Sequence, residues 1–181
     1  IPDDFFELRL IQLGYDDVMD DYVLTSNINT LTSLNLINQN ISDLTGIEDF
    51  SDLTTLHCSY NQLTSLDISN NTALDFLECV FNQLTNLDVS ANTALDYLVC
   101  SYNQLTSLDV SQNTSLTKLW CENNQLTSLD VSNGNNANLI DFKTPNNPNL
   151  TCISVDDPAW SSANWGNIDS QHYFSEDCSA K

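Results

Sequence analysis

Six cysteines are the residues of this 181-residue chain that are best suited to metal or redox chemistry, and they form two groups. Four of them recur every 21 residues: Cys58, Cys79, Cys100 and Cys121. Thiolates bind zinc or iron–sulfur clusters only where several ligands converge on one point. Thiols at a constant period lie in a row instead. The spacing therefore predicts a ladder of buried, unreactive thiols that serve as small apolar side chains.

The other two cysteines, Cys152 and Cys178, lie outside this period and enclose an aromatic segment with Trp160 and Trp165. They are predicted to form one disulfide that holds a C-terminal cap together. In the chain-entropy description, closing a loop of this length stabilises a fold by about 3 to 4 kcal/mol. Because disulfides persist in oxidising compartments, the pair indicates a secreted or cell-surface protein.

Groups suited to acid–base catalysis are few. His57 and His172 are the only histidines, and neither lies near a nucleophile motif. Glu78 and Glu122 are expected on one face, but an open sheet desolvates a carboxylate too little to raise its pKa far. We therefore expect no enzyme activity, no catalytic residue, no cofactor and no metal centre.

A column of aspartates follows the 21-residue period: Asp67, Asp88, Asp109 and Asp130. Carboxylates about 5 Å apart on neighbouring coils are compatible with calcium binding. A serine lies two residues after each of them, and this pattern is typical of side chains that accept hydrogen bonds from turn amides. The capping role is the preferred interpretation, and calcium binding is the alternative.

The cysteines and aspartates belong to a repeated unit that must position them. One copy has Leu74, Leu77, Cys79, Asn82 and Leu84, and further copies lie 21 residues before and after it. Alternation around Leu77 predicts a short strand with one buried face. Stacked copies predict a right-handed solenoid with a parallel sheet on its concave face. Since 21 residues are few for one coil, the convex side is expected to be extended or 3₁₀.

An asparagine follows each predicted strand: Asn61, Asn82, Asn103 and Asn124. A turn at this place leaves backbone donors and acceptors inside the coil, and an amide side chain satisfies both kinds of group. These asparagines are therefore predicted to be structural.

The chain is expected to form one domain, residues 1–181, closed by atypical end units. Its parts are an N-terminal cap, a repeat region and a C-terminal cap: 1–30, 31–149 and 150–181. Apolar spacing predicts an amphipathic helix from Asp3 to Leu13 in the first cap. The sequence Asp156-Asp157-Pro158 is typical of a helix start in the second.

The chain is strongly acidic, with 25 Asp and Glu residues against 4 Lys and Arg, a formal net charge of -21. This charge opposes binding to nucleic acid or to an anionic membrane. The sequence has no run of 18 apolar residues, so no membrane insertion is expected. It begins at Ile1 without Met, which we interpret as a piece of a longer secreted precursor.

Aromatic residues concentrate at the positions expected on the concave face, where folding does not require them. The candidate binding residues are Tyr60, Phe76, Glu78, Phe81, Tyr97, Val99, Tyr102, Lys118, Trp120 and Glu122. An exposed apolar patch usually marks an interaction site. Aromatic anchors suit a protein partner, while flat rings also stack on sugars. A third interpretation is that aromatic pairs stabilise the sheet itself, by about 0.2 to 1 kcal/mol each.

Two stretches, LTSLDISNNTAL from Leu63 and NQLTNLDVS from Asn82, resemble the repeats of bacterial surface proteins. With the thiol ladder, the chain is similar to the cysteine-ladder internalins with 21-residue repeats and to secreted leucine-rich repeat proteins of Flavobacteria. The resemblance implies a leucine-rich repeat solenoid that is monomeric, secreted or attached to the bacterial surface, and not enzymatic. It also implies an extracellular ligand on the concave face; a protein partner is the leading prediction, and a glycan bound by the same aromatic residues is the alternative.

Overall fold

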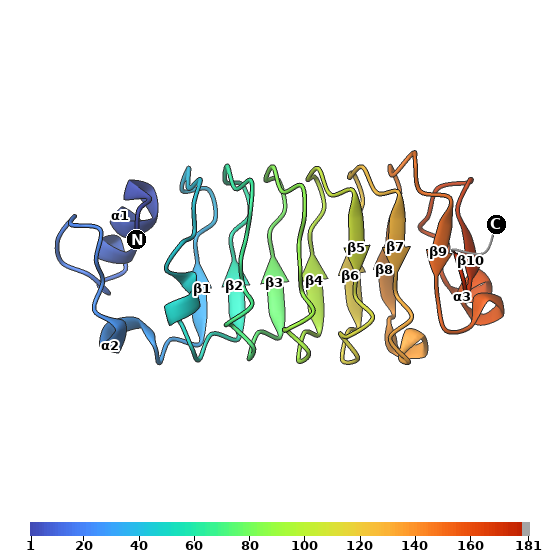
Figure 1. Cartoon of the computed structure of the whole chain (residues 1–181), viewed down its shortest axis with the longest axis horizontal. Coiled ribbons are helices and arrows are strands. Elements are labelled where there is room, and N and C mark those ends of the chain that lie inside the picture. Colours follow the sequence, from blue (N-terminus) through green and yellow to red (C-terminus); the bar gives the residue numbers. More distant parts are fainter. Residues whose placement is uncertain (179–181) are drawn as a thin grey trace.

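The computed structural model describes residues 1–178; the last three residues of the expected C-terminal cap, 179–181, lie outside the described part. The chain forms a solenoid of about seven turns (Figure 1). Six short strands, one per coil, form a parallel sheet: β1 (Ser33–Asn35), β2 (Thr55–His57), β3 (Phe76–Glu78), β4 (Tyr97–Val99), β6 (Lys118–Trp120) and β8 (Asp141–Lys143). We call the outward side of this sheet the six-stranded face; it is the side predicted to be concave.

The returning segments of the coils lie on the opposite side, the four-stranded face. Its parallel strands are β5 (Ser107–Asp109), β7 (Ser128–Asp130), β9 (Cys152–Ser154) and β10 (Tyr173–Ser175). Two 3₁₀ turns, η1 (Ile47–Asp49) and η2 (Asn136–Asn138), complete the connections. The convex side is thus extended or 3₁₀, as the short repeat predicted.

One apolar column fills the centre of the solenoid. The strand leucines are paired in register from coil to coil, as Leu56 with Leu77 and Leu98 with Leu119, and all are fully buried. The four ladder cysteines follow them as free, fully buried thiols. Burial, with the nearby Glu78 charge, raises the pKa of Cys58 to about 12. Because the thiolate is the reactive form, the full burial of the four thiols favours an unreactive ladder.

The asparagine after each strand binds backbone groups of two coils. The Asn103 side chain accepts from Leu84 N at 3.0 Å and donates to the carbonyls of Cys79 and Cys100 at 2.9 and 3.1 Å. A second ladder escaped the sequence interpretation: the buried amides of Asn71, Asn92 and Asn113. Asn92 donates to carbonyls of the preceding coil, including Asn71 O at 2.9 Å. In the sequence, these three asparagines are marked by the same 21-residue period as the strand leucines.

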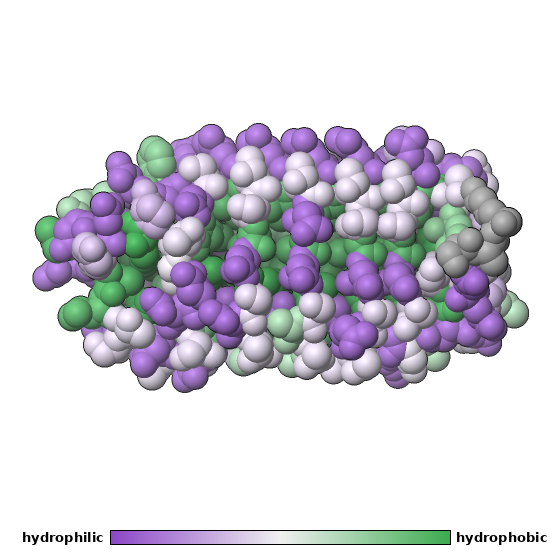
Figure 2. All heavy atoms as spheres, in the orientation of Figure 1, coloured by the Kyte–Doolittle hydropathy of each residue, from purple (hydrophilic) through white to green (hydrophobic). Residues whose placement is uncertain are grey.

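The aspartate column caps turns, as preferred from the sequence. Ser69 donates its amide and its hydroxyl to Asp67 at 3.0 and 2.7 Å, and the later aspartates accept from their own serines. These Ser69 hydrogen bonds, the hydroxyl first, lower the pKa of Asp67. The repetition appears as rows of hydrophilic residues along the molecule (Figure 2). Within residues 1–178, no three His, Cys, Asp or Glu side chains are grouped to hold a metal ion.

The N-terminal cap contains α1 (Asp4–Gln12), close to the predicted helix, and α2 (Thr25–Ile28). Asp3 caps α1 by accepting from Phe5 N and Phe6 N, both at 3.0 Å. Its second oxygen accepts from the amide and hydroxyl of Ser42 and from Asp43 N. One carboxylate therefore joins the helix to the first coil.

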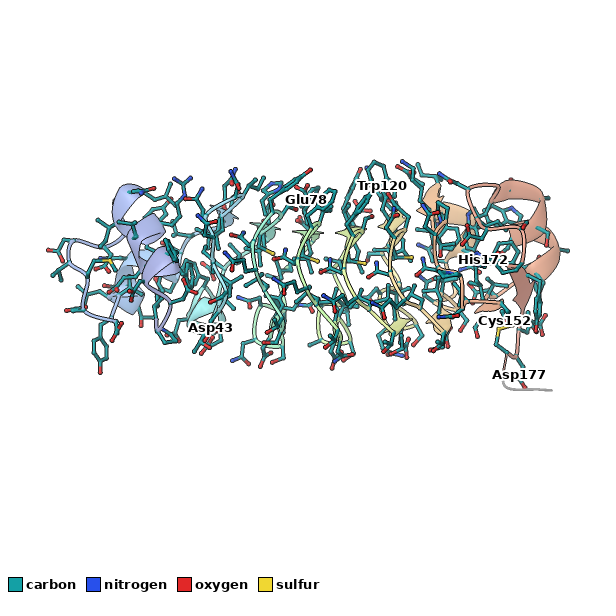
Figure 3. The ribbon with its side chains drawn as sticks, turned by 90° about the horizontal axis from the view of Figure 1, so that it is seen from above. Asp43, Glu78, Trp120, Cys152, His172 and Asp177 are labelled. Carbon is teal, nitrogen blue, oxygen red and sulfur yellow. A yellow bond between two sulfur atoms is a disulfide. The ribbon has the colours of Figure 1, made fainter. Side chains whose placement is uncertain are left out.

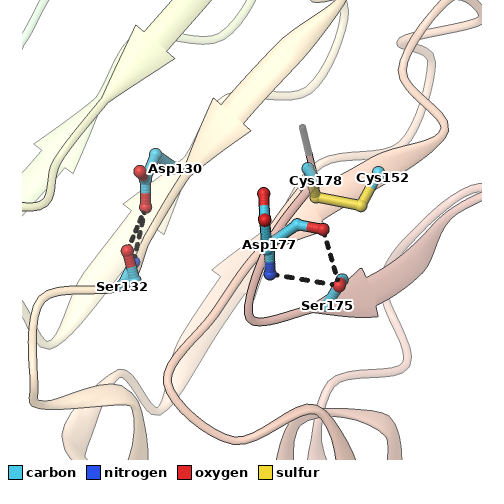
Figure 4. The surroundings of a disulfide bond; sticks show 6 residues. All are labelled: Asp130, Ser132, Cys152, Ser175, Asp177 and Cys178. Carbon is cyan, nitrogen blue, oxygen red and sulfur yellow. Dashed lines mark hydrogen bonds between the residues drawn. A yellow bond between two sulfur atoms is a disulfide. The ribbon is translucent and has the colours of Figure 1, made fainter. Parts of the chain in front are cut away.

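The C-terminal cap contains α3 (Pro158–Asn164), which begins at the predicted proline and is capped by Asp157. Trp165 lies against Phe142, with ring centroids 4.4 Å apart, and its indole N–H donates to Leu139 O. The predicted disulfide between Cys152 and Cys178 is present (Figure 4). It joins β9 to the segment that follows β10.

Candidate binding face

The side chains on the six-stranded face point away from the opposite face, which carries the aspartate column. Figure 3 shows Glu78 and Trp120 on one side of the solenoid and Asp43 on the other. Strand register brings the predicted residues from successive coils together, because Phe76 pairs with Tyr97, and Val99 with Trp120. The candidate residues therefore form one continuous surface over four coils.

Three aromatic residues form a stack along the edge of this face, which we call the aromatic ladder: Tyr60, Phe81 and Tyr102. The ring centroids are 4.7 Å apart between Tyr60 and Phe81 and 4.2 Å apart between Phe81 and Tyr102. The three residues are 53%, 40% and 43% exposed. Each has a positive φ, between 54° and 59°. This left-handed backbone is unfavourable for a bulky side chain and is normally left to glycine or asparagine.

A second line of rings lies within the strands themselves. His57 and Phe76 have ring centroids 4.9 Å apart, and Phe76 and Tyr97 have centroids 5.7 Å apart. His57 Nδ1 also lies 2.8 Å from Glu78 Oε2, so a histidine and a carboxylate are in hydrogen-bonding contact at this end of the face. The rings of neighbouring strands are therefore in contact with one another.

A cationic cluster lies at the other end of the face. The ammonium groups of Lys118 and Lys143, the lysine pair, lie 3.7 and 3.3 Å from the centroid of the Trp120 ring. Asp141 contacts both at 3.5 and 4.0 Å. Lys143 was not among the residues selected from the sequence, because two extra residues in the preceding turn place it 23 residues after Trp120.

Two of the predicted positions differ from expectation. Val99 is buried, with 8% of its surface exposed, because the larger Glu78 and Trp120 lie beside it in register. Glu122 is only partly exposed, and its Oε2 atom is buried without a hydrogen-bond partner. Ser59 and Ser101, which directly follow two of the ladder cysteines, are buried as well. The exposed part of the face is thus narrower than the strand alternation alone predicts.

The described cavities on the other side are shallow and acidic. One of about 390 Å³ is lined in part by Leu108, Leu129 and Asp130, and another of about 360 Å³ in part by Leu66 and Asp67. The six-stranded face, in contrast, presents its rings on an open sheet. Among residues 1–178, no helix has the length and apolar character needed to cross a membrane.

Comparison with known proteins agrees with this geometry. A family model of leucine-rich repeats in two copies matches residues 93–134. Internalin J of Listeria monocytogenes is 44% identical over 71 residues, which are 39% of this chain and 8% of that protein. The structure of the functional domain of internalin J, which includes a cysteine ladder, matches with a TM-score of 0.73 and 41% identity over 85% of this chain.

The chain spans 36% of the length of that internalin J domain. A leucine-rich repeat protein of Leptospira interrogans matches with a TM-score of 0.57 at 20% identity, covering 82% of this chain and 44% of that one, which supports the fold alone. The coil geometry, the buried thiol ladder and the capping disulfide point to the same family. The chain therefore folds as a leucine-rich repeat solenoid with a buried cysteine ladder and a disulfide in its C-terminal cap, and it is similar to the internalin J domain.

Proposed function

We propose that the domain is a non-enzymatic extracellular recognition module that binds a protein partner through its six-stranded face. The observation that carries this proposal is the aromatic ladder. Three exposed rings occupy a backbone conformation that costs a bulky residue about 1 kcal/mol or more. Residues held in unfavourable conformations concentrate at functional sites.

Neighbouring coils show what the fold itself requires at this position. Asn38 precedes the aromatic ladder and Asn123 and Asn146 follow it, all with a positive φ between 56° and 62°. Asparagine tolerates this conformation because its short polar side chain forms local hydrogen bonds. Asparagine is therefore sufficient for folding at this position, and the fold does not explain the aromatic rings on the three central coils. Contact with a partner supplies an explanation.

The orientation of the rings favours a protein over a glycan. Sugars stack on the flat faces of aromatic rings, but both faces of Phe81 are occupied by stacked Tyr60 and Tyr102. What the ladder offers outward is a ridge of ring edges. Such a ridge suits the apolar side chains that form the centre of protein interfaces.

The disulfide and the family resemblance support a secreted or cell-surface location, and net charge favours a partner that is basic overall. A catalytic role gains no support from the histidines of the chain. His57 is paired with Glu78, and His172 is buried in the C-terminal cap next to Asp169. We place the domain as residues 1–181, with the repeats between two caps.

The test exploits the asparagines of the neighbouring coils. The variant Tyr60→Asn/Phe81→Asn/Tyr102→Asn should keep its melting temperature, because asparagine suits the backbone at all three positions. Wild type and variant are compared on a panel of purified extracellular proteins by surface plasmon resonance. Saturable protein binding that the variant loses supports the proposal. Binding that is equal in both proteins excludes the aromatic ladder as the contact.

Glycan recognition is the alternative function, and a glycan array with the same two proteins separates it from the first. The chain offers a matched control in Ile140→Ala, which removes an exposed apolar side chain (82% exposed) away from the ladder. Reproducible glycan binding that the ladder variant loses and Ile140→Ala retains would replace the protein partner by a polysaccharide.

A further inference from the structure

The lysine pair is unusual in a chain that contains four basic residues and 25 acidic ones. Arg9 belongs to the N-terminal cap, where it donates to Asn35 O, and Lys181 lies outside the described residues. The other two cations occupy adjacent strands, β6 and β8, on the binding face. Basic charge in the described repeats is therefore concentrated at one end of one surface.

Hydrogen-bond donors exceed acceptors at this place. Each lysine ammonium has three N–H donors, and its polar contact in the described chain is the loose ion pair with Asp141 at 3.5 or 4.0 Å. The indole Nε1 of Trp120 is buried and has no hydrogen-bond partner. A buried donor without an acceptor costs free energy.

The lysine pair is also held in place. Both side chains lie over the indole ring, so cation–π contact and the Asp141 carboxylate restrict flexible stems that would otherwise lose conformational entropy on binding. The two ammonium groups share one carboxylate, Asp141. At physiological ionic strength the screening length is about 8 Å, so a group that touches the lysine pair is influenced more by these two ammonium groups than by the acidic column on the opposite face.

Resting on the proposed function, we infer that the lysine pair and Trp120 form a subsite for a carboxylate, the Asp or Glu side chain of the protein partner. The aromatic ladder contacts apolar side chains of the same partner, and the subsite fixes its position along the face. A positively charged side chain of a partner would be repelled at this contact, because it would face two ammonium groups.

The experiment follows the Trp120 indole N–H signal by NMR of the ¹⁵N-labelled domain, assigned with Trp120→Phe, at physiological salt. The probes are N-acetylglutamate N-methylamide, the matching glutamine amide and glucuronate. We expect a saturable shift with the glutamate probe and none with the glutamine probe. The variant Lys118→Met/Lys143→Met, which keeps the apolar stems over the ring, should bind about tenfold more weakly or not at all.

Two further variants serve as controls. Lys118→Arg/Lys143→Arg keeps both charges and should keep the shift, and Arg9→Gln removes a distant positive charge and should not change it. An absent glutamate shift, or one that the methionine variant retains, overturns the subsite. A stronger response to glucuronate overturns the assignment to a protein carboxylate.

Failure of this inference can be separated from failure of the proposed function. The aromatic-ladder variant should lose the protein partner but retain the glutamate shift, because Tyr60, Phe81 and Tyr102 lie outside the cationic cluster. If the shift is absent while the ladder variant still loses the partner, the subsite is wrong and the binding face stands. If the shift is present and the ladder variant binds normally, the proposed contact is wrong and the subsite stands.

Discussion

The two faces of the solenoid are built from the same coils but follow different rules. On the four-stranded face each repeat carries the same aspartate and serine, and the hydrogen bonds between them recur with almost the same distances. On the six-stranded face the residues change from coil to coil, as in the series Thr55, Phe76, Tyr97 and Lys118. A position that is constant from coil to coil has a structural role in every coil, namely forming the turn and closing the coil. A position that varies is free to serve a partner.

The comparison also separates two kinds of energy. Periodic residues satisfy buried backbone groups, so their loss should unfold the domain. Variable aromatic and lysine residues stand outside the core, so their loss should affect recognition more than stability. Substitutions on each face of the solenoid test this difference between periodic and variable residues.

The largest effect is expected for a periodic amide. Asn103→Ala leaves Leu84 N and the carbonyls of Cys79 and Cys100 without their partner inside the coil, and should lower the free energy of unfolding by about 3 to 5 kcal/mol. Urea denaturation measures the loss. Gln104→Ala, one residue away on the exposed surface, is the matched control and should change stability little. Equal effects would mean that the amide ladder is not the source of coil stability.

The next effect concerns the two kinds of cysteine. Replacing the disulfide by Cys152→Ala/Cys178→Ala should cost about 3 to 4 kcal/mol, since the bond closes a loop with a sequence separation of 26 residues. Thiol titration provides the contrast. The native wild type should expose none of the four ladder thiols, and unfolding without reductant should release four. Six free thiols would rule out the disulfide in solution, and two or fewer would rule out a reduced ladder.

A smaller effect should appear in acid at the N-terminal cap. Burial of Asp3 raises the pKa of its carboxyl group, but hydrogen bonds from Ser42, Phe6 and Asp43 together lower this pKa by a larger amount. The pKa in the folded protein therefore lies below its ordinary value of 3.8. The carboxylate therefore stabilises the fold above that value, and this contribution is lost as pH falls through the lowered pKa. Asp3→Asn should cost about 2 kcal/mol at pH 7. The difference between wild type and variant should vanish in strong acid, and a constant difference would show that the charge is not involved.

The smallest effect is expected on the variable face. Phe81→Asn removes two stacking contacts but relieves an unfavourable backbone conformation, so the free energy of unfolding should change by less than about 1 kcal/mol. Thermal denaturation measures the change, with Leu84→Ala as the buried control. A loss as large as that of the control would show that the rings serve folding, and the distinction between the two faces would fail.

Much of the architecture could be predicted because each coil repeats one local solution. The spacing of Leu77, Cys79 and Asn82 is sufficient to predict a strand, a buried thiol and a turn amide, and Asp157 before Pro158 predicts a capped helix. The disulfide followed from two cysteines that break the period. The second amide ladder at Asn71, Asn92 and Asn113 is equally periodic, but a period does not show that a polar side chain is buried, because asparagine is usually exposed.

The repeat period is enough to predict which residues share a column, since a fixed period assigns every side chain to one place on the coil. How neighbours in different columns pack depends on the three-dimensional fold. Val99 is buried because larger side chains lie on both sides of it, and the positive φ of Phe81 depends on the turn that its coil must make. Lys118 and Lys143 both contact Trp120 because their long, flexible side chains, from adjacent strands, reach the same ring. Such contacts depend on side-chain volume and reach across strands, which a one-dimensional period does not encode.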